Sequence, residues 1–155
     1  MSHIVIISNR YDYSYTVSLL DYYIDVTPFA VPGPYQVQLT LNYPDISNVY
    51  YSDGVATIGP SVEYPNAYTG FYSVNLKLRK MTITHLISAS WSGDFSFAGP
   101  VVTSLTSGAN LPQPAYFISY STYSGPGILT STATTIALNW IGLYFNQGDE
   151  IVIGW

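Results

Sequence analysis

Residues 72–87 read YSVNLKLRKMTITHLI, and this stretch decides the fold class. Every second residue from Tyr72 to Leu78 is apolar, and the residues between them are polar. Because successive side chains of a strand point to opposite faces, this alternation predicts a half-buried strand. Residues 81–87, MTITHLI, are expected to return beside the first strand, with Lys80 near the turn.

The same period of two recurs along the chain. In YQVQLTL, residues 35–41, the apolar side chains fall on one face and the polar ones on the other. Glu, Lys and Arg are scarce and β-branched residues and tyrosine abound, which favours strands over helices. Asp53-Gly54 is a tight-turn signal between strands. Further strands are expected at 13–20, 115–121, 128–137, 140–145 and 150–155, with weaker ones at 49–51 and 95–97.

The length and the number of short strands indicate one folded domain. The 155 residues suffice for a single core, and the absence of cysteine excludes disulfides and thiolate metal ligands. We therefore expect an all-β, single-domain antiparallel β-sandwich over residues 1–155, with a jelly roll as the favoured arrangement and an immunoglobulin-like sandwich as the next.

The charge composition is unusual for a soluble monomer. Charged residues make up 8% of the chain, against about 25% in an average domain. A net charge of −5 argues against direct binding of nucleic acid, which needs several cations. The apolar run at residues 4–7 is too short for a membrane span or the core of a signal peptide, so we expect no membrane insertion.

No sequence pattern indicates catalysis. His3 and His85 are the two histidines, and neither stands in a metal-binding or catalytic motif. Several carboxylates adjoin glycines, where turn chemistry explains them. We expect no enzyme activity, no catalytic residue, no cofactor and no metal ion.

Tyrosine is the most suggestive residue type, with sixteen copies. A tyrosine ring buries apolar area while its hydroxyl stays hydrogen-bonded, which suits protein interfaces and also stacking on sugars. The first use predicts a protomer that assembles with copies of itself through sheet edges and Tyr-rich faces. Its interface candidates are Ile4, Ile6, Tyr11, Tyr13, Lys77, Arg79, Ile151 and Trp155.

The second use predicts a glycan-binding or adhesive module, located outside the cell or on its surface. The loop at residues 64–72 then supplies the binding residues. Its candidates are Tyr64, Asn66, Tyr68 and Tyr72.

Three of the four cations lie at positions 77, 79 and 80. Cations on an edge strand prevent unwanted strand pairing. They can equally pair across subunits with the acidic residues Asp12, Asp21 and Asp25, or bind a phosphate. The first two interpretations are preferred here.

The closing segment carries a family resemblance. Residues 136–140, IALNW, and residues 145–153, FNQGDEIVI, are similar to the closing hairpin of small single jelly-roll viral capsid and coat proteins. Similar hairpins occur in C1q/TNF-type heads. The resemblance to coat proteins implies a structural protomer located in a virion, whose partners are copies of itself and other virion proteins, with no active site.

Overall fold

The computed structural model describes residues 35–77, 79–106 and 114–155, whose strands belong to one compact unit. The strand expected at 13–20 and the candidates Ile4, Ile6, Tyr11 and Tyr13 lie outside the described residues. The prediction of one domain over residues 1–155 therefore stays a prediction. The elements are β1 (Gln36–Asn42), β2 (Val49–Thr57), β3 (Tyr64–Asn66), α1 (Ala67–Gly70), β4 (Tyr72–Lys77), β5 (Lys80–His85), β6 (Ala89–Trp91), β7 (Gly99–Ser104), β8 (Tyr116–Tyr120), β9 (Ile128–Ser131), β10 (Thr135–Asn139), β11 (Leu143–Phe145) and β12 (Glu150–Gly154).

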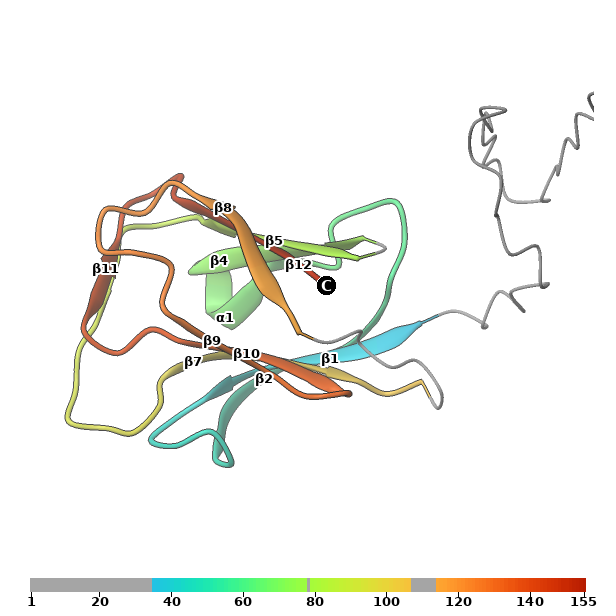
Figure 1. Cartoon of the computed structure of the whole chain (residues 1–155), viewed down its shortest axis with the longest axis horizontal. Coiled ribbons are helices and arrows are strands. Elements are labelled where there is room, and N and C mark those ends of the chain that lie inside the picture. Colours follow the sequence, from blue (N-terminus) through green and yellow to red (C-terminus); the bar gives the residue numbers. More distant parts are fainter. Residues whose placement is uncertain (1–34, 78, 107–113) are drawn as a thin grey trace, which may run out of the picture. The chain divides into compact units, whose positions relative to one another are not determined.

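The strands form two five-stranded sheets and one two-stranded sheet (Figure 1). The first sheet has the order β2-β1-β7-β10-β9 and the second β3-β4-β5-β12-β8, while β6 pairs with β11. The pairings between these strands are antiparallel. The predicted all-β antiparallel fold is confirmed.

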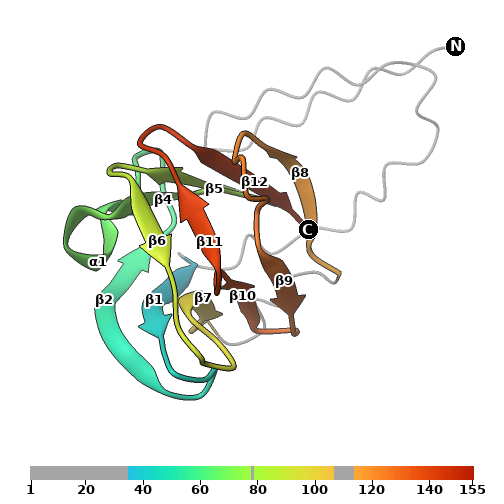
Figure 2. The same ribbon diagram turned by 90° about the vertical axis from the view of Figure 1, so that its left-hand side faces the viewer.

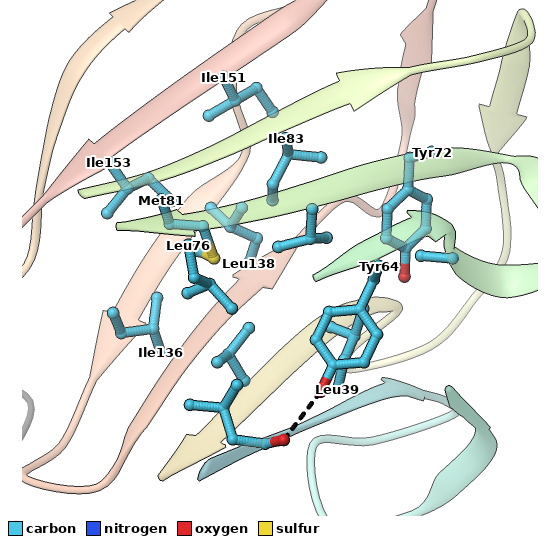
Figure 3. Close-up of a cluster of buried hydrophobic side chains, with 14 of the residues drawn as sticks. Leu39, Tyr64, Tyr72, Leu76, Met81, Ile83, Ile136, Leu138, Ile151 and Ile153 are labelled. Atoms are coloured by element: carbon cyan, nitrogen blue, oxygen red, sulfur yellow. Dashed lines mark hydrogen bonds between the residues drawn. The ribbon is translucent and has the colours of Figure 1, made fainter. Parts of the chain in front are cut away.

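The apolar faces of the two five-stranded sheets enclose one core. Leu39 and Ile136 from the first sheet belong to the same buried cluster as Leu76, Ile83 and Ile153 from the second (Figure 3). Each of these five side chains is at most 1% exposed. The architecture is therefore a β-sandwich.

The predicted alternation is confirmed in the central strands. In β1, Val37, Leu39 and Leu41 are buried as predicted, although Thr40 and Asn42 on the opposite face are also buried. In β4 and β5, alternate residues are buried and half-exposed, and the two strands pair as a hairpin. Burial of one face of each strand sets the register, because a slip of one residue would expose the whole apolar set.

A long antiparallel ribbon connects the sheets. Strands β5, β6 and β7 follow one another along the chain, and β12, β11 and β10 return beside them in reverse order. Thr84 lies opposite Glu150 where β5 meets β12. Val102 lies opposite Ile136 where β7 meets β10. The ribbon thus runs from one five-stranded sheet through the two-stranded sheet into the other (Figure 2). The jelly-roll connectivity is a finer statement and stays a prediction.

Several predicted strand boundaries were wrong. The range 128–137 contains two strands, β9 and β10, because the Thr132 hydroxyl accepts a hydrogen bond from the N–H of Thr135 at 3.0 Å and closes a turn. No strand covers 95–97; β6 and β7 lie on either side of it. In the range 140–145, β11 begins only at Leu143.

Asp53-Gly54 lies inside β2 rather than in a turn between strands. Gly54 is opposite Leu39 and Ser52 is opposite Thr40, so Asp53 is the extra residue of a β-bulge. Gly54 has φ +84°, which glycine adopts without strain. The Asp-Gly pair therefore marks a backbone irregularity, and tertiary pairing makes it a bulge.

Candidate functional site

A long segment of the chain without charged residues contributes two consecutive strands to one side of the sandwich. Between Asp94 and Asp149 the sequence contains no Asp, Glu, Lys, Arg or His. This stretch supplies β8 and β9, each of which is one of the two edge strands of its five-stranded sheet in the described part of the chain. The N–H of Ala115 donates to the Ser131 hydroxyl at 3.2 Å and joins the start of β8 to the end of β9. Figure 2 shows both strands on the same side of the domain, which we call the β8–β9 side, residues 114–131.

Strand β8 carries exposed apolar side chains along its outer face. Tyr116, Ile118 and Tyr120 are 55%, 52% and 53% exposed. Gly154 of β12 lies opposite Tyr116, and a Cβ there would be 2.9 Å from both the Tyr116 ring and Ile118. The two side chains therefore lie over bare backbone, where any residue larger than glycine would displace them.

The outer edge of β8 lacks the usual protection against further pairing. Residues 115–121 contain no charge and no proline. Ile118 stands in a register shift between the pairs Phe117–Ile153 and Ser119–Val152, which is the one protective irregularity of this strand. An uncharged edge with exposed apolar residues is a template for association.

The loop at 121–127 connects β8 to β9 and is held at both ends. The Ser121 hydroxyl accepts from the N–H of Glu150 at 2.8 Å, and the Ser121 N–H donates to the Glu150 carbonyl at 2.9 Å. At the other end a Cβ on Gly127 would lie 2.6 Å from the Asn139 carbonyl oxygen, so the two backbones are packed closely. Between these anchors the side chain of Tyr123 is 94% exposed.

A shallow groove of about 480 Å³ lies beside this loop. The amide of Asn139 is its main polar group, and that amide is already engaged. Its oxygen accepts from the N–H groups of Ala98 and Ile141 at 3.2 Å, and its nitrogen donates to the Ser96 carbonyl at 3.0 Å. The lining consists of Phe95, Ser96, residues 124–128, Asn139, Ile141 and Leu143.

The predicted cationic contacts are only partly available. The Lys77 ammonium donates to the carbonyl oxygens of Gly59 and Pro60 at 2.9 and 2.8 Å, so it holds the loop of its own chain. Glu63 completes this arrangement, because its carboxylate accepts from the N–H of Gly59 at 2.9 Å. Arg79 is exposed in the β4–β5 turn, with φ +61°. Lys77 thus has an intramolecular structural role.

Of the two predicted interface residues at the C-terminal strand, Ile151 requires a correction. Its side chain is 0% exposed and belongs to the core, because the period of two in β12 points it inward. Trp155 is half-buried and packs against the same core. The exposed apolar residues of this sheet lie instead on β8, which pairs with β12.

The glycan candidates do not form one accessible set. Tyr64 and Tyr72 are 5% and 0% exposed, so neither ring can stack on a sugar. The Tyr64 hydroxyl donates to the Val37 carbonyl at 2.8 Å, and burial raises its pKa to about 12. Burial likewise raises the pKa of Tyr72 well above its usual range. Asn66 is exposed and Tyr68 half-buried.

Tyr68 belongs to a separate aromatic group that the sequence did not reveal. Its ring centroid lies 6.3 Å from that of Tyr50 and 5.6 Å from that of Tyr51, both exposed on β2. Tyr68 and Thr69 have φ +45° and +56°, a left-handed turn that β-branched residues rarely adopt. Asp53 supports this turn by accepting from the Tyr68 N–H at 2.9 Å. Burial raises the pKa of the Asp53 carboxyl, while this hydrogen bond acts in the opposite direction.

His85 lies in the core and does not face the solvent. It is 2% exposed and stacks on Phe145 with ring centroids 4.0 Å apart. Burial lowers its pKa to about 4, with Asp149 acting in the opposite direction. In residues 35–77, 79–106 and 114–155, no three His, Cys, Asp or Glu side chains gather as metal ligands.

None of the helical structure in the described part of the chain is long and apolar enough to cross a membrane. The chain matches no protein-family model, no curated protein and no solved structure. The fold and the site therefore define an antiparallel β-sandwich module with one uncharged, aromatic side.

The best candidates on that side were missed by sequence reasoning. The sequence predicts a strand over residues 115–121 but not which face Tyr116, Ile118 and Tyr120 occupy, and no prediction covers Tyr123. The absence of charged residues between Asp94 and Asp149 is visible in the sequence and could have indicated this part of the surface.

Proposed function

We propose that this protein is a structural protomer of a virion, a capsid or coat protein that assembles with copies of itself. The observation that carries the proposal is the uncharged edge strand β8 with Tyr116, Ile118 and Tyr120 exposed. In a soluble monomer such an exposed edge strand would promote nonspecific aggregation. A specific partner that covers the edge strand prevents this.

The distribution of charge supports a second copy as that partner. The whole chain carries −5, so two copies repel each other wherever their charged surfaces meet. In a symmetric contact between two copies, the same surface patch of each copy meets the other. Any charged residue in that patch therefore lies near charges of the same sign on the second copy. The β8–β9 side avoids this repulsion because it carries no charge.

Tyrosine suits such a contact. Its ring supplies apolar area and its hydroxyl keeps a hydrogen bond, without the desolvation cost of burying an ion. Interfaces are enriched in tyrosine and depleted in lysine and glutamate at their centres. The composition of the whole chain follows the same trend.

The assignment to a virion rests on the resemblance of the closing hairpin to small jelly-roll coat proteins. The ribbon formed by β5–β7 and β10–β12 supports it, since two sheets joined by such a ribbon are the architecture that the resemblance implies. Copies of itself and other virion proteins are then the expected partners.

The first test is the native mass of the full chain by light scattering over a wide concentration range. We expect an oligomer or larger assembly. Ile118→Lys places a charge on the exposed edge and should weaken assembly by at least about tenfold, because the ammonium would be buried without a partner. Val55→Lys is the matched control, since Val55 is 54% exposed on the edge strand β2 at the other end of the first sheet.

Circular dichroism and thermal melting should show both variants folded. A wild-type chain that stays monomeric up to millimolar concentration would contradict the proposal. Equal effects of the two lysine variants would place the contact elsewhere.

A second candidate function, glycan binding, is favoured by one observation. Tyr50 and Tyr51 stand exposed beside Tyr68, which is held in a strained left-handed turn by Asp53. Strained residues of this kind cluster at functional sites, and sugar rings stack on exposed aromatics.

A glycan array with the wild-type chain tests this candidate. Tyr50→Ala should remove at least about 90% of the bound signal, because stacking on the most exposed ring is lost. Tyr64→Phe serves as the control, since its ring is buried and cannot contact a sugar. An array on which the wild-type chain binds nothing would retire the candidate.

A further inference from the structure

We infer that Tyr123 of one copy inserts its ring into the groove beside Ile128 of a second copy, and that the second copy returns the same contact. The inference rests on the proposed function and names one of its contacts. Tyr123 is 94% exposed, the highest exposed fraction among the large apolar side chains described.

The loop that carries the ring is anchored at both ends by contacts within its own chain. Ser121 is held by two hydrogen bonds to Glu150, and Thr122 is buried. Gly127 closes the other end against Asn139. Ordering a mobile loop on binding would oppose association, whereas a fixed loop avoids most of that loss. Rigid, exposed tyrosines are typical anchors at protein interfaces.

The groove suits an uncharged aromatic side chain. Phe95, Ile141 and Leu143 provide apolar lining, and the amide of Asn139 has both its oxygen and its nitrogen engaged. A charged or strongly polar ligand would find few free partners there. The volume of about 480 Å³ lies within the range of sites that hold small organic groups, so one tyrosine ring fits.

The position of the ring beside the groove favours a second copy as the occupant. Tyr123 directly precedes residues 124–128, which line the groove. A twofold axis near this loop would therefore place each ring close to the groove of the other chain. Tyr123 and the residues that line the groove are uncharged, so no like charges meet inside the contact. The exposed Asp94 and Glu150 lie at its borders, next to Phe95 and paired with Ser121.

Such a contact is small. Two tyrosine rings bury about 300–500 Å² of their own area, whereas stable interfaces bury at least about 1,200 Å² in total. It is therefore a weak contact that gains strength when each copy makes several contacts, as in a closed shell. This predicts that its loss reduces the size of the assembly rather than the folding of the protomer.

The experiment measures assembly of the full chain by sedimentation velocity for the wild type and three variants. Tyr123→Ala should weaken association by about 30-fold, the effect of losing an interface anchor. Tyr123→Phe should keep wild-type association because the ring remains. Ile46→Ala is the control, an apolar side chain 48% exposed in the loop after β1.

Photocrosslinking then locates the partner surface. Tyr123→benzoylphenylalanine keeps an aromatic ring, and on irradiation we expect a chain dimer whose crosslinked peptide contains Phe95, Ile128, Ile141 or Leu143. Crosslinks that map outside the groove, or a Tyr123→Ala variant that associates as strongly as the wild type, would overturn this contact and leave the proposed function standing. A monomeric wild type would overturn both.

Discussion

At the scale of the residue, His85 shows how burial decides chemistry. Neither ring nitrogen has a hydrogen-bond partner, and the ring stacks on Phe145 and packs near Trp140 at a centroid distance of 5.0 Å. Burial in this apolar setting lowers its pKa to about 4, so the imidazole is neutral at pH 7. A histidine of this kind packs as a core side chain, out of reach of a substrate in the solvent.

The lowered pKa predicts acid sensitivity. As the pH falls from 6.5 toward about 4, the unfolded chain binds a proton at His85 and the folded chain does not, so the free energy of unfolding decreases. The full effect is about 3 kcal/mol. His85→Phe removes it and keeps an aromatic stack. Urea unfolding at pH 7, 5.5 and 4 checks this, and parallel pH dependences of the two proteins would contradict it.

The burial of a tyrosine cannot be predicted from its local sequence alone. Tyr64 is buried and Tyr123 exposed, although both lie in similar Tyr-rich and Pro-rich sequence. The difference arises because the Tyr64 hydroxyl meets the carbonyls of Val37 and Gly54, which belong to distant parts of the chain. A tyrosine can therefore be a core residue or an exposed surface residue, and its tertiary contacts determine which.

At the scale of the element, period-two strands are predicted best. β1, β4 and β5 have the buried faces that were expected. The alternation of apolar and polar residues within each strand is enough to show which face packs on the core. The bulge at Asp53 and the split of 128–137 were missed. Both depend on pairing with a neighbouring strand or on a side-chain hydrogen bond, which no local pattern specifies.

Edge strands are the elements that matter for assembly, and their identity is not local either. Residues 115–121 were expected to form a strand, and β8 confirms it. The strand order β5-β12-β8 places β8 at the edge of its sheet. The same order places β12, which carries the buried Ile151, between two neighbouring strands. This order places the exposed apolar face on the strand that has no neighbour on its outer side within the described sheet.

At the scale of the whole molecule, charge is distributed unevenly. The described acidic and basic side chains lie in the segments before Phe95 and after Gly148, and the uncharged stretch forms the side with β8 and β9. An assembly contact on that side involves no ion pair. The net charge of −5 opposes association only through the remainder of the surface.

This distribution predicts the dependence of assembly on salt. Raising the ionic strength from about 0.02 to 0.5 M should leave association unchanged or strengthen it, because screening reduces repulsion and removes no attraction. Contacts between Arg79 or Lys80 and the acidic residues Asp12, Asp21 and Asp25 would give the opposite trend. Light scattering over a salt series distinguishes the two, and dissociation at high salt would support the ionic contact.

The all-β class and the central strands could be predicted from the amino-acid sequence, because the alternation of apolar and polar residues is a local property of each strand. The shortage of charge follows directly from the composition. Only the tertiary structure shows which tyrosines are buried, which strands lie at the edges of the described sheets and that a groove lies beside the loop that carries Tyr123. These features depend on pairing between residues far apart in the chain, such as Glu150 with Thr84 and Ala115 with Ser131. No short stretch of sequence contains both partners of such a contact.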